Sequence, residues 1–178
     1  DNTKAILSLV DGPTEPVRAG KTFDITVKID GAVTVRTYEA HVQFDPAKVQ
    51  PLEIVSNGSL FEWYLQDMGA RIKGDNDMGF VNSIIGHTPF GASGTATLAT
   101  IRFRVLVRGG ETALKLTDAT LIDVEHKEYT PQLGQSLSIV LSNEAAIYHD
   151  AEGNEIRSLI LPEADNKVDF NDFLMLAK

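Results

Sequence analysis

Hydrophobic and polar residues alternate along most of the chain, and a period of two residues predicts β-strands. In segment 21–29 every second residue is large and apolar, and the residues between are mainly polar. Segment 37–46 shows the same alternation until Pro46 ends the strand. The strands predicted in this way span 4–10, 21–29, 37–46, 49–55, 61–66, 70–73, 79–85, 95–107, 112–123 and 135–141.

Gly, Pro, Asp or Asn residues close these segments, and turn signals recur about every dozen residues. No segment between the predicted strands shows the periodicity of a helix. A parallel sheet, which needs crossover helices between its strands, is therefore excluded. The pattern therefore predicts an all-β fold, an antiparallel two-sheet sandwich of about nine strands.

The composition changes after residue 142. Segment 143–178 contains eight Asp or Glu residues against three Lys or Arg residues. Apolar runs on both sides of the AEGN segment predict a β-hairpin, because Gly153 and Asn154 accept positive φ. One short terminal helix is predicted after Pro162. The chain thus divides into a sandwich, 1–142, and a C-terminal extension, 143–178, which we expect to pack on it.

The net charge of −9 disfavours binding to nucleic-acid backbones and to anionic lipids. Apolar runs are only a few residues long, so no membrane span is predicted. The absence of cysteine excludes disulfides and thiolate chemistry. The sequence starts at Asp1, as a secreted protein does after signal removal, and we expect an extracellular or cell-surface location. Asn57 begins an Asn-Gly-Ser sequon in a predicted turn, which makes it a candidate glycosylation site.

Four stretches of the chain, in order, resemble a cohesin domain, the bacterial extracellular module that receives dockerins in cellulosomes. They are TFDITVKIDGA, TYEAHVQFDPAKVQPLEIVSNGSLF, FVNSIIG and SGTATLATIRFRV. The resemblance implies a jelly-roll sandwich without catalytic activity whose function is protein–protein attachment. It also implies that one sheet face binds the partner, and that the strand before the FDP motif contributes an asparagine and an aspartate, at positions that Thr37 and Glu39 hold here. With two neighbours on the same outward face, the candidate partner-binding residues are Thr37, Glu39, His41 and Gln43.

Segment 162–178 resembles half of a dockerin, whose loop follows the scheme D-x-N-x-D-G-x-x-[ND]-x-x-D and leads into a short helix. This resemblance implies a Ca²⁺ site whose ligands are Glu163, Asp165, Asp169 and Asp172. A helix without metal is the alternative, because acidic residues are also typical of a helix N-terminus. In both cases the apolar stripe of so short a helix must pack against a surface. That stripe consists of Phe170, Phe173, Leu174 and Ala177.

Asp75 and Asp77, in the KGDNDMG segment, are a second candidate site for a hard cation. The alternative is a hairpin turn held by the hydrogen bonds of Asp and Asn side chains. Catalysis finds no support in the sequence, because its four histidines are scattered and it contains neither a GxSxG nor an HExxH motif. The sequence therefore predicts a protein that is not an enzyme.

The predicted function is a structural or adhesive module that binds a protein partner. A dockerin-like tail on the same chain as a cohesin-like sandwich favours head-to-tail association of copies into fibres or a surface layer. Strand donation from the N-terminal segment TKAILSLV is another route to assembly. The alternative function is a carbohydrate-binding module for a polysaccharide. Its candidate stacking residues are Trp63, Tyr64, Phe80 and Phe90.

Overall fold

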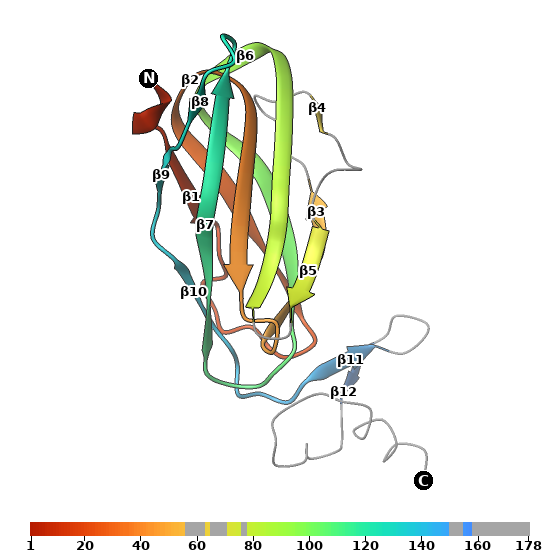
Figure 1. Ribbon diagram of the computed structural model, residues 1–178. Helices are drawn as coiled ribbons and strands as arrows, with labels where there is room; N and C mark the ends of the chain where they lie inside the picture. The colour runs from red at the N-terminus through yellow and green to blue at the C-terminus, as the bar shows by residue number, and fades with distance from the viewer. Residues whose placement is uncertain (56–62, 65–70, 76–77, 150–154, 158–178) are drawn as a thin grey trace.

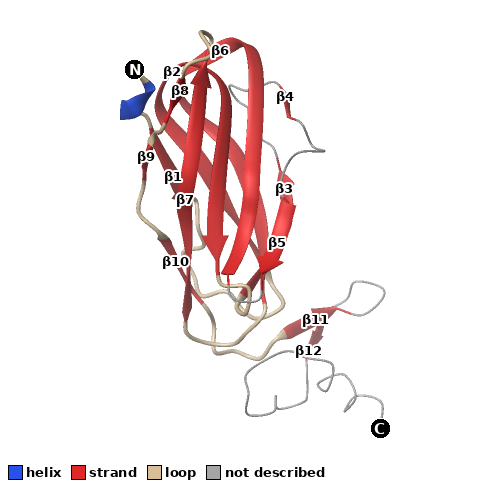
Figure 2. Ribbon diagram, viewed as in Figure 1, coloured by secondary structure: helices blue, strands red, loops and turns tan. Residues whose placement is uncertain are grey.

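The structure, a computed structural model, describes residues 1–55, 63–64, 71–75, 78–149 and 155–157 (Figure 1). Strands make up almost all of its regular structure, as the alternating pattern predicts (Figure 2). One 3-10 helix, η1 (Asn2–Lys4), precedes them. The strands are β1 (Ile6–Val10), β2 (Thr22–Phe44), β3 (Val49–Val55), β4 (Trp63–Tyr64), β5 (Arg71–Asp75), β6 (Met78–Val105), β7 (Glu111–Asp123), β8 (Glu128–Tyr129), β9 (Gln132–Leu133), β10 (Leu137–Val140), β11 (Ile147–His149) and β12 (Glu155–Arg157).

Two long strands, β2 and β6, organise the fold, because each has different neighbours along its two halves. Residues 22–29 of β2 lie between β1 and the last part of β6, and that part of β6 also pairs with β3. We call this arrangement the β1 layer. Residues 37–44 of β2 lie between β7 and the first part of β6, which also pairs with β4 and β5. With β10 on the other edge of β7, this is the β7 layer.

The continuity of β2 and β6 differs from the sequence-based prediction, which placed two separate strands in each. Gly31, Gly91 and Gly94 indicate turns in the sequence, but here they have φ of 74°, 74° and 98° within continuous strands. Thr34 has φ of 48°, a backbone conformation that is costly for a β-branched residue. Register shifts interrupt the β2–β6 ladder at the same places, so both strands bend there. Within the described segments, ten strands therefore form one hydrogen-bonded network rather than two separate sheets.

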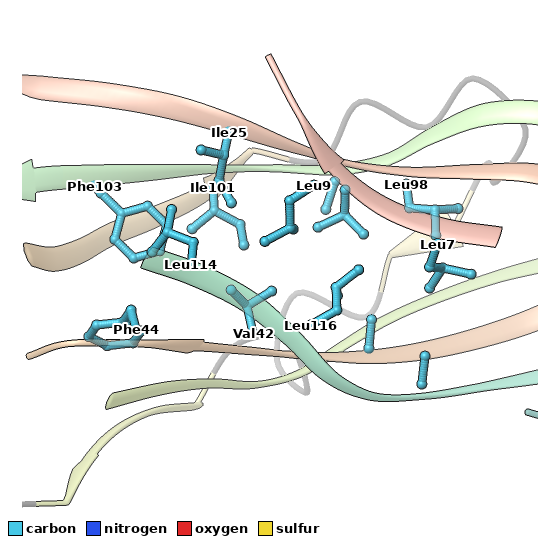
Figure 3. Packing of buried hydrophobic residues seen from close by; sticks show 14 of the residues in the cluster. Leu7, Leu9, Ile25, Val42, Phe44, Leu98, Ile101, Phe103, Leu114 and Leu116 are labelled. Atoms are coloured by element: carbon cyan, nitrogen blue, oxygen red, sulfur yellow. The ribbon is translucent and has the colours of Figure 1, made fainter. Parts of the chain in front are cut away.

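The hydrophobic core lies between the two layers and follows from the alternation along their strands. Figure 3 shows apolar side chains of both layers, among them Ile25 and Val42, in the space between the ribbons. Phe103 is completely buried, stacks on Phe23 and meets the edge of Phe44, with ring centroids 5.6 Å apart in both pairs. These rings join the two layers, since Phe23 and Phe103 belong to the β1 layer and Phe44 to the β7 layer.

The N-terminal segment is already part of its own sheet. Strand β1 pairs antiparallel with β2 on one side and parallel with β9 on the other, and Leu7 and Leu9 are buried. Before it, the Asn2 side chain donates to the carbonyl oxygen of Val33 and accepts from its N–H, at 2.8 and 2.7 Å. Donation of this segment into a neighbouring molecule stays a prediction, and it would require the segment to leave its own sheet, which exposes Leu7 and Leu9 and breaks both ladders.

The predicted C-terminal hairpin appears as the antiparallel pair β11 and β12, with Tyr148 opposite Ile156. The predicted terminal helix lies outside the described residues. Among the residues that the structure describes, no helix is long and apolar enough to cross a membrane.

Candidate functional site

The four partner-binding residues predicted from the sequence lie on one strand and share one direction. In the second half of β2, the residues Tyr38, Ala40, Val42 and Phe44 are buried. The residues between them point away from the core and are partly exposed, as the period of two requires. These outward residues, the polar row, are Thr37, Glu39, His41 and Gln43.

Strand β7 places a second line of side chains beside the polar row. Its register brings Ile122 opposite Thr37 and Thr120 opposite Glu39. Sequence reasoning missed these neighbours, because the register between two strands that are far apart in the chain cannot be deduced from the sequence of either strand. We call the combined surface the polar face, and it consists of the polar row together with Lys115, Asp118, Thr120 and Ile122.

Charges on the polar face are placed side by side and are mostly open to solvent. His41 Nε2 lies 3.2 Å from Glu39 Oε1 within the polar row. Asp118, opposite His41, and Lys115, opposite Gln43, are exposed and form no ion pair with the described residues. This arrangement offers both signs of charge to an approaching molecule.

A β-bulge shapes the middle of this face. The β2–β7 register shifts between His41 and Val42, so that Thr117 and Asp118 of β7 are both exposed in succession. A bulge re-aims side chains and increases local twist, and here it turns two polar groups outward in place of one. The face is thus more polar at this point than strict alternation would make it.

The turn after β7 fixes one end of the polar face. Asp123 is buried, and its carboxylate accepts hydrogen bonds from the N–H groups of Glu125 and Lys127 and from the hydroxyl of Tyr129, at 2.9, 3.0 and 2.8 Å. The backbone bond from Lys127 is the largest cause that lowers the pKa of Asp123, followed by the Tyr129 bond. The same bond to Asp123 raises the pKa of Tyr129. An ionised Asp123 therefore holds the turn that leads into β8.

The turn after β2 lies at the other end. Asp45 Oδ1 accepts from the N–H of Ala47 at 2.9 Å, and its carbonyl oxygen accepts from the N–H groups of Lys48 and Val49. The Lys48 ammonium donates to the carbonyl oxygen of Glu111 at 2.9 Å and thereby joins this turn to the start of β7. An open pocket of about 630 Å³ lies between the turn, β7 and the segment before β10.

The outer face of the β1 layer differs from the polar face. Arg102 on β6 binds both carboxylate oxygens of Asp24 on β2, at 2.8 and 2.9 Å, and one oxygen of Glu53 on β3, at 2.6 Å. These three residues form what we call the ion-paired face. The hydrogen bonds and charge of Asp24, followed by the charge of Glu53, raise the pKa of Arg102.

The remaining predicted sites receive no structural test. Asn57 and Asp77 lie outside the described residues, as do the tail ligands Glu163, Asp165, Asp169 and Asp172 and the stripe Phe170, Phe173, Leu174 and Ala177. Asp75 ends β5. In the part of the chain that the structure describes, no group of three His, Asp or Glu side chains is placed to hold a metal ion. Of the proposed stacking aromatics, Phe90 is 85% exposed.

The fold and these surfaces define a class of protein, a β-sandwich module that presents a polar sheet face. The cohesin domain family model matches residues 8–140, and the chain belongs to this family. Cohesin domains mediate attachment between proteins. A comparison with curated protein sequences finds no match.

Solved structures with the same fold include cohesins of bacteria and of an archaeon. A non-cellulosomal cohesin from Archaeoglobus fulgidus is 16% identical, with a TM-score of 0.59 over 78% of this chain and 91% of that one. CaCohA2 from Clostridium acetobutylicum is 18% identical, with a TM-score of 0.60 over 81% and 94%. The sixth cohesin of Acetivibrio cellulolyticus scaffoldin B, solved in complex with a mutant Cel5 dockerin, is 15% identical, with a TM-score of 0.56 over 79% and 100%. At this identity the likeness establishes the fold.

Proposed function

We propose that this chain is a non-catalytic attachment module whose polar face binds a protein partner. The observation that carries the proposal is the open arrangement of charges on that face, where Lys115 and Asp118 stand beside the polar row without ion pairs among the described residues. Groups of this kind gain hydrogen bonds and charge pairs when a complementary surface covers them. The membership in the cohesin family supports the same function.

Rigidity of the polar face favours binding. Its side chains project from paired strands, and hydrogen-bonded turns at Asp45 and Asp123 hold both ends. A surface that is already ordered loses little conformational entropy when a partner docks. The face is therefore suited to recognition of a folded partner as a rigid body.

The partner that we propose is a dockerin-like segment. In two solved complexes of related folds, a cohesin is bound to a dockerin. The tail of this chain, 162–178, resembles half of such a segment in sequence, so a second copy is the candidate source. This form of the proposal predicts head-to-tail assembly outside the cell or at its surface, and Ca²⁺ strengthens it if the acidic residues of the tail bind that ion.

The test is an affinity measurement between the immobilised chain and two kinds of probe. One is a panel of dockerin modules that includes those of Clostridium acetobutylicum and Acetivibrio cellulolyticus, and the other is a peptide of residues 143–178 with Ca²⁺ or with a chelator. We expect binding to at least one probe, and Thr37→Arg, which places a long charged side chain in the polar row, should weaken it about tenfold or more.

Lys28→Glu is the matched control, because Lys28 is exposed on the outer face of the β1 layer. It should leave the affinity unchanged. Absence of binding to every probe would contradict the proposal, as would a partner whose affinity falls with Lys28→Glu and not with Thr37→Arg. Sedimentation of the full chain at high concentration, with and without Ca²⁺, separates self-assembly from attachment to another protein.

A further inference from the structure

Three segments of the chain meet at the end of the sandwich that lies away from the C-terminal hairpin (Figure 1). The N–H of Val124, in the turn after β7, donates to the carbonyl oxygen of Thr34 in the bend of β2, at 3.1 Å. The bend of β6 lies against both, because a Cβ on Gly91 would come 2.5 Å from Val124 Cγ1 and 3.1 Å from the Thr34 carbonyl oxygen. Backbone contacts therefore hold these three segments together.

Each of the three segments exposes one large apolar side chain. Phe90 is 85% exposed, Val33 43% and Val124 38%. We call these three residues the apolar tip. A single exposed apolar residue is common on a protein surface, but three of them on adjoining segments, one of them an aromatic ring, are typical of a site where another molecule docks.

The apolar tip continues the polar face. Ile122, the only apolar member of the polar face, and Val124 lie on either side of the buried Asp123. A partner that covers the polar face as far as Ile122 therefore meets Val124 next. Such a partner finds little apolar surface on the polar face, so its own apolar side chains are best buried at the tip.

Basic groups border the apolar tip. Arg36 Nη1 lies 3.3 Å from His126 Nε2, and Lys127 Nζ lies 5.0 Å from the centre of the Tyr129 ring. Neither Arg36 nor Lys127 forms an ion pair with a carboxylate of the described residues. Glu125 is the one acidic side chain of the same turn. The surroundings of the tip thus favour an occupant that is apolar and carries an excess of negative charge.

The tail of the chain has this chemistry. Segment 158–178 carries the carboxylates Glu163, Asp165, Asp169 and Asp172 against only two lysines, Lys167 and Lys178. Its predicted helix has the apolar stripe Phe170, Phe173, Leu174 and Ala177, and so short a helix is stable only when its stripe is covered.

The tail of a second copy fits the tip better than the tail of the same molecule. The extension leaves the sandwich at the opposite end, the base, where the Ser142 N–H donates to the Val17 carbonyl oxygen at 2.8 Å. Strand β7, which runs from the base to the tip, is about 40 Å long at roughly 3.3 Å per residue. The chain from Arg157 to Phe170 reaches at most about 45 Å. A contact within one molecule would need this segment almost fully extended, whereas a contact between two molecules does not.

We propose that the apolar tip receives the apolar stripe of the tail of a second copy, with Phe90 as the main anchor. The polar face contacts the polar residues of the same tail, and the tail carboxylates lie toward Arg36 and Lys127. This inference rests on the proposed function, since it takes the tail as the partner, and it adds the place where the apolar side chains of that partner are buried.

The test compares the self-association of full-length variants by sedimentation, with and without Ca²⁺. Phe90→Ala removes the anchor, and Phe173→Ala removes a central residue of the stripe. Each should raise the dissociation constant of self-association about tenfold or more. Val140→Ala, at an exposed position of β10, is the control and should leave it unchanged.

An equimolar mixture of the Phe90→Ala and Phe173→Ala chains is the decisive sample. The intact tail of the first variant can bind the intact tip of the second, so the mixture should form a one-to-one dimer with an affinity close to that of the wild type. The proposal is overturned if the wild-type chain stays monomeric at high concentration, which is also the result expected if each tail docks within its own molecule. It is equally overturned if the mixture associates no more than either variant alone.

Thr37→Arg separates this inference from the proposed function. Self-association that is lost with Thr37→Arg but kept with Phe90→Ala would overturn the role of the tip and support attachment at the polar face. The reverse result would support the tip and contradict attachment at the polar face. Phe90 is exposed, so Phe90→Ala should leave the urea midpoint unchanged, and a loss of association is then a loss of binding.

Discussion

The two outer faces of the sandwich both include residues of β2, yet their charged side chains are arranged differently. On the ion-paired face, Arg102 bridges Asp24 and Glu53 across three adjacent strands, so these charges are already paired. On the polar face, Asp118 and Lys115 are exposed and have no ion pair among the described residues. A partner that binds Asp118 and Lys115 need not displace an ion pair of the described residues, so it gains more there than it would at Arg102.

The number of charges on a surface is therefore a poor guide to its role. Both faces carry acidic and basic side chains, but Lys115 and Asp118 of the polar face form no ion pair with the described residues, whereas Arg102 of the ion-paired face binds two carboxylates. Exposed ion pairs contribute little to stability. The main consequence of the pairing on the β1 layer is therefore that Arg102, Asp24 and Glu53 are less available to a binding partner. The following variants test this difference, beginning with the largest expected effect.

Phe103→Ala should destabilise the hydrophobic core that lies beneath both faces. The side chain is completely buried and contacts Phe23 and Phe44 from the two layers. Removal of a buried aromatic ring costs about 3–5 kcal/mol of unfolding free energy. Urea denaturation measures this, with Val140→Ala at an exposed position as the control. A loss no larger than that of the control would mean that the layers are not joined through these rings.

Asp123→Asn should destabilise the turn at the end of the polar face, because it removes the carboxylate that accepts the hydrogen bonds of this turn. It should leave the ion-paired face unchanged. The lowered pKa of Asp123 means that the unfolded chain binds this proton more readily than the folded one. The stabilisation is therefore present above the ordinary carboxyl pKa and is lost as the pH falls through the lowered folded value. Urea midpoints across a pH series should show a clear deficit for the variant at about pH 6 that shrinks in acid. A deficit that is independent of pH would contradict the role of the ionised carboxylate.

Thr112→Val should stabilise the free protein by about 1 kcal/mol, because it removes a buried hydroxyl that lacks a partner among the described residues. The same denaturation experiment measures it. A loss of stability would indicate that the hydroxyl is bonded within the protein.

Arg102→Met should have the smallest effect. Its ion pairs lie on a partly exposed surface, so stability should change little, and the change should diminish further in high salt. Partner affinity should stay the same. A fall in affinity comparable to that of Thr37→Arg would show that the ion-paired face takes part in attachment.

Much of the fold follows from the sequence, because the period of two correctly places the core residues in both halves of β2. The sequence does not predict that β2 and β6 are each one continuous strand. Gly31 and Gly91 indicate strand ends in the sequence, but in the structure they lie at bends within strands that continue. The polar row was also accessible to sequence reasoning through its alternation. Lys115 and Asp118 were not, because the β2–β7 register depends on packing between segments about 75 residues apart.

Attachment to the partner occurs, in our proposal, at the polar face. Amide chemical-shift mapping of the labelled chain, with whichever dockerin module or tail peptide binds, tests it most directly. We predict shifts concentrated in residues 37–43 of β2 and 115–122 of β7, with none around Asp24, Glu53 and Arg102. Shifts confined to the ion-paired face, with the polar face unchanged, would contradict the account.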